Sequence, residues 1–232
     1  MNANAKKSKN NDTRTGESEI TKIVESKIQA VFQMGGFIGA DAYLKGKWIN
    51  SARSPKYSSE TYAEVNGAAF TFYVIGVVGY SAFTSKESCV TIELNSDFGR
   101  MCDHSRYNGN LMAYLGQSTK DITNGYKNPC REGKMKFVYK TADKLLGSLE
   151  VVDVDGETIE DRNDIKRGDL VIVQFALQSY ESENVNLDGK FEKTRGARLV
   201  LLMVQRLFSG YDGNIVPKEK EIPVSPAKKV KF

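Results

Sequence analysis

Residues 170–177 read LVIVQFAL, an apolar run directly after the turn-forming residues Arg167, Gly168 and Asp169. A run of this length, rich in β-branched and aromatic side chains and bounded by glycine and aspartate, is typical of a buried strand. It therefore predicts a central strand of a β-sheet.

Upstream, the segment KMKFVYK alternates between two kinds of side chain. The alternation assigns them to two strand faces, Lys134, Lys136, Val138 and Lys140 on one and Met135, Phe137 and Tyr139 on the other. Lysines on one face can neutralise nucleic-acid phosphates. Lysines also guard edge strands against pairing, so a solvated edge strand fits the segment equally well.

Other strand signals surround these two. Residues 70–80 and 89–94 are predicted strands joined by a polar connection at 84–87, and residues 151–154 lead into an Asp155-Gly156 turn. The apolar stretch 67–83 is slightly too short for a membrane-spanning helix and is interrupted by glycines. Its β-branched and aromatic composition favours strands. Short strands separated by turns favour a mainly β fold, a small barrel or sandwich.

The last predicted strand spans residues 197–207, after a polar loop expected at 181–195. Alternation would divide this strand into two faces, Leu199, Leu201 and Met203 on one and Arg198, Val200, Leu202, Val204 and Arg206 on the other. Arginine both pairs with phosphate and stacks on bases, so Arg195, Arg198 and Arg206 are candidate ligand residues or ordinary surface arginines.

The amino-terminal half is less clear. Residues 19–34 fit a helix by spacing and a strand by their β-branched content. Residues 95–133 are expected to form a long loop with a short helix near 110–115. We expect a disordered arm at residues 1–18, one domain at 19–208 and a flexible basic tail at 209–232.

The reactive residues give little sign of catalysis. The sequence has no phosphate-binding glycine loop and no nucleophile elbow, and its single histidine is His104. Cys102, Asp103, His104 and Cys130 lack the paired spacing of a structural zinc site. We expect no enzyme activity, no metal and no cofactor. Three cysteines and a polar amino terminus indicate a reducing, intracellular setting, and the formal charge is +4.

Aromatic residues are the better binding signal. The chain has 11 Tyr and 11 Phe, and every nucleic-acid base offers a face on which an aromatic ring can stack. Most of these rings must belong to the core. Tyr180 is the preferred exception, because it follows the 170–177 strand among polar residues.

Residues 134–208 resemble the second half of the viral and bacteriophage single-stranded-DNA-binding proteins built on an OB-fold. The likeness lies in the order of KMKFVYK, VVDVDGETIED, RGDLVIVQFALQSY and GARLVLLMVQRL. It implies an OB-fold-like barrel with long loop insertions, a basic cleft and exposed aromatic residues. The matching positions are Lys134, Lys136, Phe137, Tyr139, Tyr180 and Arg198.

The carboxyl terminus departs from that family, whose members commonly carry an acidic tail. Phe232 is here preceded by Lys228, Lys229 and Lys231, which suggests a nuclear-import signal, added DNA affinity or simple solubility.

The sequence thus predicts a protein that coats single-stranded DNA during replication, recombination and repair, in the cytoplasm or nucleus of a host. Partners would be DNA and replication proteins reached through the tails, with no membrane and an oligomer allowed. A structural or capsid-associated protein that contacts packaged genome is the alternative. A metal-dependent nuclease using Cys102 and His104 has the weakest support.

Overall fold

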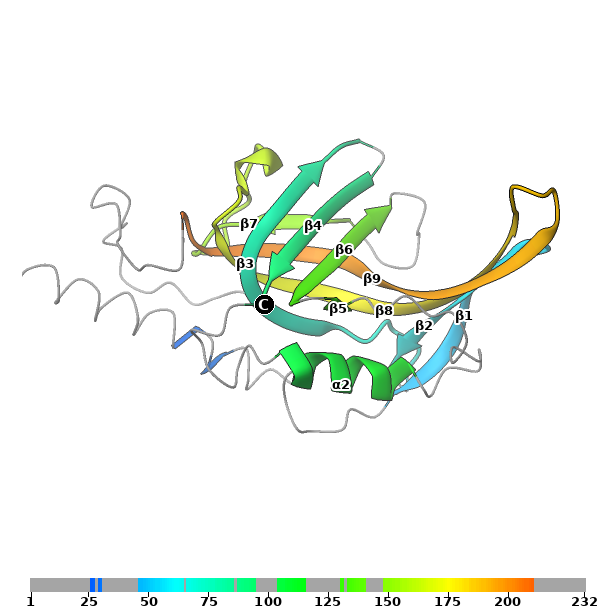
Figure 1. The fold of residues 1–232 in the computed structure, drawn as a ribbon. Helices are drawn as coiled ribbons and strands as arrows, with labels where there is room; N and C mark the ends of the chain where they lie inside the picture. Colours follow the sequence, from blue (N-terminus) through cyan, green and yellow to red (C-terminus); the bar gives the residue numbers. More distant parts are fainter. Residues whose placement is uncertain are drawn as a thin grey trace, which may run out of the picture.

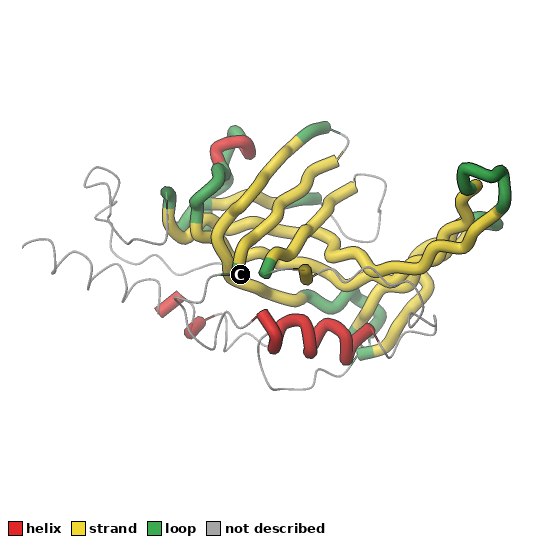
Figure 2. Tube along the Cα trace, viewed as in Figure 1, coloured by secondary structure: helices red, strands yellow, loops and turns green. Residues whose placement is uncertain are grey.

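The computed structural model describes residues 26–27, 29–30, 46–64, 66–85, 87–94, 104–115, 130–131, 133–140 and 148–210. Its elements are β1 (Lys47–Ser54), β2 (Tyr57–Ala63), β3 (Phe72–Phe83), β4 (Glu87–Glu93), α2 (His104–Leu115), β5 (Cys130–Arg131), β6 (Lys134–Lys140), β7 (Glu150–Val152), η2 (Arg162–Asp164), β8 (Leu170–Val185) and β9 (Phe191–Phe208). The described part of the chain is mainly β (Figure 2), as predicted.

Five of the strands close into a ring. β3 pairs with β4, β4 with β6, β9 with β8 and β8 with β3, all antiparallel, while β6 pairs with β9 in parallel. A five-stranded barrel with this Greek-key path is the arrangement of an OB-fold. The class of fold is therefore an OB-fold-like β-barrel, and the segment that resembled that family, residues 134–208, contributes its last three strands.

The barrel interior is apolar and aromatic. Phe175 on β8 contacts both Phe72 on β3 and Phe137 on β6, with ring centroids 5.6 and 5.1 Å away. Helix α2 lies across one end of the barrel (Figure 1), where Tyr114 packs against Phe72 and Tyr62. The helix predicted near 110–115 is present and is longer than expected, because it begins at His104.

β8 and β9 run past the barrel as a curved hairpin, which we call the arm (Figure 1). The expectation of a polar loop at 181–195 was wrong, because residues on both sides of Asn186–Gly189 continue the ladder. Gly189 adopts a φ of +75°, which suits glycine in the tight turn at the tip. β2 pairs with β8 along the base of the arm, and β1 pairs with β2.

The predicted faces of the last strand were partly wrong. Gln174 pairs with Met203 but Phe175 pairs with Leu201, which leaves Leu202 as an extra residue in β9. Such a bulge reverses the alternation beyond it. Leu199 and Leu201 are buried as expected, but Val204 takes the buried place predicted for Met203.

In the amino-terminal half, β3 and β4 overlap the two strands predicted at 70–80 and 89–94 with shifted ends, and Thr84 and Glu87 are hydrogen-bonded across their turn. β1 and β2 had not been predicted. The described residues of the ambiguous stretch 19–34 (26–27 and 29–30) are helical. Residues 1–18 and the tail beyond residue 210 lie outside the described residues, as do Cys102 and Asp103.

Candidate nucleic-acid interface

The residues on the outer face of the barrel are identified by their neighbours along each strand, which point into the core. On β6, Met135 and Phe137 are fully buried while Lys136 between them is exposed. On β4, Val90 and Ile92 are buried, so Thr91 points outward. The alternation predicted for KMKFVYK is thus confirmed at its centre.

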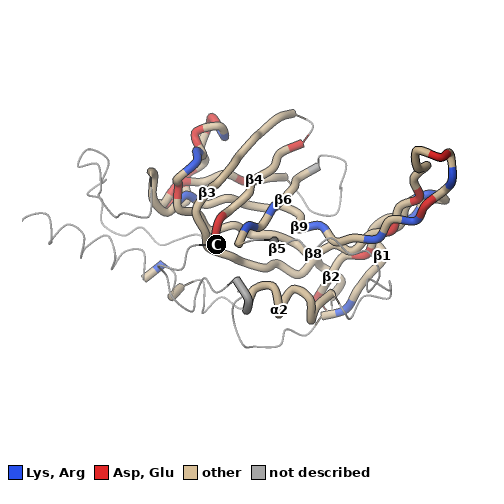
Figure 3. Tube along the Cα trace, viewed as in Figure 1, with Lys and Arg blue, Asp and Glu red and all other residues tan. Residues whose placement is uncertain are grey.

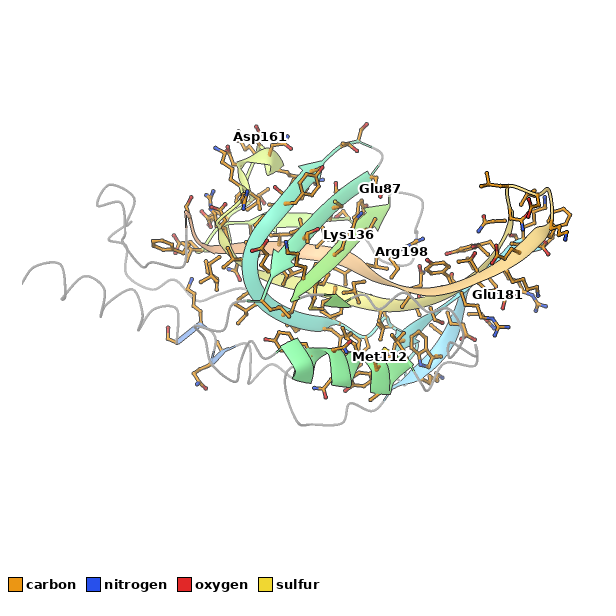
Figure 4. All side chains as sticks on the ribbon, in the orientation of Figure 1. Glu87, Met112, Lys136, Asp161, Glu181 and Arg198 are labelled. Atoms are coloured by element: carbon orange, nitrogen blue, oxygen red, sulfur yellow. The ribbon has the colours of Figure 1, made fainter. Side chains whose placement is uncertain are left out.

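Strand register brings outward side chains from several strands into one row. Tyr80 on β3 pairs with Thr91, and Thr91 pairs with Lys136. Lys136 and Arg198 each precede one residue of the pair Phe137 and Leu199, so they share the outer face of β6 and β9. Figure 4 shows Lys136 and Arg198 on these neighbouring strands.

The row continues onto the arm. Arg198 pairs with Gln178 on β8, and Tyr180 lies two residues further along the same face. Tyr57 on β2 lies beside Tyr180, with ring centroids 6.4 Å apart and ring planes 22° apart. We call Tyr80, Lys136, Arg198, Tyr180 and Tyr57 the outer row.

Arg198 and Tyr180 form the best-defined pair in the outer row. The Arg198 guanidinium carbon lies 5.5 Å from the centre of the Tyr180 ring, within the range of a cation–π interaction. Its Nη1 also donates to Oε1 of Gln178 at 3.5 Å, and Gln178 Nε2 donates to the Ser51 hydroxyl at 3.4 Å. Gln178 is 1% exposed, so this support is buried.

Charge is uneven along the outer face. Lys134 forms an ion pair with Glu93 at 3.2 Å, so its charge is locally balanced. Within the described part of the chain, Lys136 has no comparable acidic partner. Burial raises the pKa of the neighbouring Cys89 thiol, while the charge of Lys136 acts in the opposite direction. The thiol therefore stays neutral beside the lysine.

The arm carries a second charged group on its other face. Arg195 Nε donates to Oε2 of Glu181 at 2.9 Å, and Lys193 Nζ lies 3.3 Å from Oε1 of the same carboxylate. The hydrogen bond from Arg195 is the main reason that the pKa of Glu181 is lowered. Figure 3 shows cations and anions interleaved along this hairpin. Because alternate residues face opposite sides, Arg195 and Tyr180 do not share a face.

The structure places the other predicted site residues elsewhere. Phe137 is 0% exposed, so its expected role in stacking is corrected: it is a core residue. Tyr139 is half-buried and packs against the core. Lys140 ends β6, with its side chain outside the described residues. Arg206 Nη1 donates a hydrogen bond to the Asp164 carbonyl at 3.4 Å. Arg206 lies eight residues after Arg198 on β9, which at ~3.3 Å per residue puts the two arginines roughly 25 Å apart.

Sequence reasoning did not single out Tyr57 or Tyr80 as site residues. Tyr80 is 57% exposed and is the one exposed residue of β3, yet only its pairing with Thr91 places it in the outer row. Among the described residues, no group of three His, Cys, Asp or Glu side chains could hold a metal ion. The helices seen in the structure are also too short or too polar to cross a membrane.

No protein-family model matches the chain, and no curated protein matches it. A search of solved structures finds similarity to the crystal structure of gp2.5, a single-stranded DNA binding protein encoded by bacteriophage T7, at a TM-score of 0.30 and 15% identity. The match covers 66% of this chain and 97% of that one. The fold class stated above rests on the strand pairings.

Proposed function

We propose that the protein binds single-stranded DNA along the outer row, with little sequence preference and no chemical step of its own. The observation that carries the proposal is the grouping of aromatic and cationic side chains on one face of the paired strands, namely Tyr80, Lys136, Arg198, Tyr180 and Tyr57. OB-folds bind oligonucleotides on this outer strand face and on the adjoining loops and hairpins.

Each component of the row suits a single strand. Aromatic rings stack on unpaired bases of any identity, which gives affinity without sequence readout. Lysine and arginine neutralise phosphates and release bound counterions. A duplex keeps its bases inside and offers no base faces to Tyr80 or Tyr180. We therefore propose a preference for single strands, and a role in the replication, recombination and repair steps that expose them.

The test is fluorescence anisotropy of the full chain with labelled oligonucleotides, single-stranded and duplex DNA and single-stranded RNA, across a salt series. Tight binding that weakens with salt and prefers single-stranded DNA is the expected result. The Tyr180→Ala variant should lose roughly 5- to 150-fold in affinity, corresponding to ~1–3 kcal/mol for one stacked base. Tyr180→Phe keeps the ring and should bind like the wild type.

Equal binding to duplex, or no binding at low salt, would contradict the proposal. Light scattering on the same samples separates it from the alternative of a structural protein, which would assemble into large particles on nucleic acid. RNA binding as tight as DNA binding would broaden the ligand to single-stranded nucleic acid in general.

A further inference from the structure

Gly196 lies opposite Tyr180 in the pairing of β8 and β9, on the face that carries the outer row. A Cβ atom at this position would lie 2.7 Å from Oη and 2.8 Å from Cζ of Tyr180. Real Cβ atoms essentially never approach another atom so closely. The Tyr180 ring therefore occupies the space that any other residue at position 196 would fill with its side chain.

Backbone conformation does not explain the glycine. Gly196 is not among the glycines with positive φ, so an alanine would fit the local backbone. In the middle of a paired strand, glycine is ordinarily unfavourable relative to residues with a side chain. The close approach of the Tyr180 ring is the feature that explains a glycine at position 196.

The ring over Gly196 is also held along the arm. Arg198 lies at one side, 5.5 Å from the ring centre, and Tyr57 lies at the other, 6.4 Å away. Gln178, directly opposite Arg198 on β8, accepts a hydrogen bond from its guanidinium. A ring pushed away from Gly196 would have to move relative to both neighbours, which would break the spacing of the outer row.

We propose that Gly196 is a positioning residue, which places the Tyr180 ring for stacking by leaving it room on the neighbouring strand. This inference rests on the binding function proposed above and adds a residue that contacts no ligand. Binding to a ring that is already in place avoids the cost of ordering it on association. A side chain at position 196 lowers affinity without removing any group that touches DNA.

The experiment is a double-mutant cycle on the full chain, comparing wild type, Gly196→Ala, Tyr180→Ala and the double variant by anisotropy with a single-stranded oligonucleotide. We expect Gly196→Ala alone to weaken binding by at least ~5-fold, the lower end of one lost stacking contact. In the Tyr180→Ala background the same change should alter affinity by less than ~2-fold, because coupled residues are not additive.

Gly109→Ala is the matched control, since a Cβ at Gly109 on α2 meets nothing within 4 Å. It should bind like the wild type, and thermal melts should show that all variants fold. If a folded Gly196→Ala variant binds with wild-type affinity, the inference about Gly196 is overturned while the proposed function stands. An equal loss in both backgrounds would also overturn it, because it would mean that Gly196 acts through the fold. Failure of the wild type to bind would overturn the proposed function as well.

Discussion

The Arg198 guanidinium covers the Tyr180 ring from the neighbouring strand, 5.5 Å from its centre, while Gln178 accepts a hydrogen bond from the same guanidinium. The arginine is thus held in one orientation before any ligand arrives. Its charge therefore lies directly beside the Tyr180 ring, which puts a phosphate partner next to an aromatic residue.

Arg198 and Arg195 give a matched comparison, because they lie three residues apart on opposite faces of β9. Arg198→Ala should weaken single-strand binding by roughly 10-fold or more, since it removes a phosphate partner and loosens Tyr180. Arg195→Ala removes the same charge from the face that lacks the row and should have a much smaller effect. Anisotropy titrations at one salt concentration would show the difference, and equal losses would argue against the outer row.

Lys136 should contribute to the salt dependence of binding. One phosphate contact on a single strand contributes about 0.7 to the slope of log affinity against log salt. Lys136→Ala should therefore reduce the slope by about that amount. Arg206→Ala, at the distant end of β9, should leave the slope unchanged, and Lys134→Ala should reduce it less because Glu93 already pairs with Lys134. A slope reduced equally by all three variants would indicate diffuse electrostatic attraction.

Phe137 should affect stability and not recognition. Its ring is fully buried against Phe175, so Phe137→Ala should lower the free energy of unfolding by about 3–5 kcal/mol. Urea unfolding followed by circular dichroism measures this change. At temperatures where the variant remains folded, its affinity for single-stranded DNA should be close to that of the wild type. A stable variant that had lost binding would restore Phe137 to the site.

Glu181 should make the arm sensitive to acid. Its pKa is lowered by Arg195 and Lys193, so its contribution to stability is present above the ordinary glutamate pKa and is lost as pH falls through the lowered value. Because the side chains are partly exposed, we expect only ~0.2–1 kcal/mol from the ion pairs. Urea midpoints of wild type and Glu181→Gln should differ at neutral pH and converge in acid, once the pH has fallen below the lowered pKa of Glu181.

Glu183→Gln is the control for that comparison, since it removes the same charge two residues away on the same face of β8. Its midpoint should lie closer to the wild type at neutral pH. A difference between wild type and Glu181→Gln that persisted in acid would show that the pairing with Arg195 is not its source.

Local patterns were enough to predict the strands of the barrel and the orientation of β6. Period-two alternation belongs to one strand, so it correctly put Met135 inside and Lys136 outside. The same alternation already placed Phe137 with the inward residues, and carrying it over from the family as a ligand residue went against that signal. The sequence also indicated that Arg206 lies far from Arg198, because the two residues are eight positions apart along one strand.

What sequence could not supply was the pairing between strands. Tyr57 joins the outer row only through register with Ser182, a residue far from it in the chain, and Tyr80 joins it through register with Thr91 on the next strand. The bulge at Leu202 shifts one strand against its partner by a single residue, which no pattern within β9 announces. Likewise, the arm was mistaken for a loop because its polar side chains are those of a strand that stands away from the core.

The ring of strands closes through β6 and β9, where only Phe137 with Leu199 and Val138 with Val200 are paired in register. So short a seam is the natural place for the barrel to open locally, and Lys136 and Arg198 stand on its two sides at one end. Single-stranded DNA that bound both cations would bridge β6 and β9 and hold the two strands together. Hydrogen exchange at the backbone amides of Val138 and Val200 should then slow on binding, because the bound ligand stabilises the closed barrel.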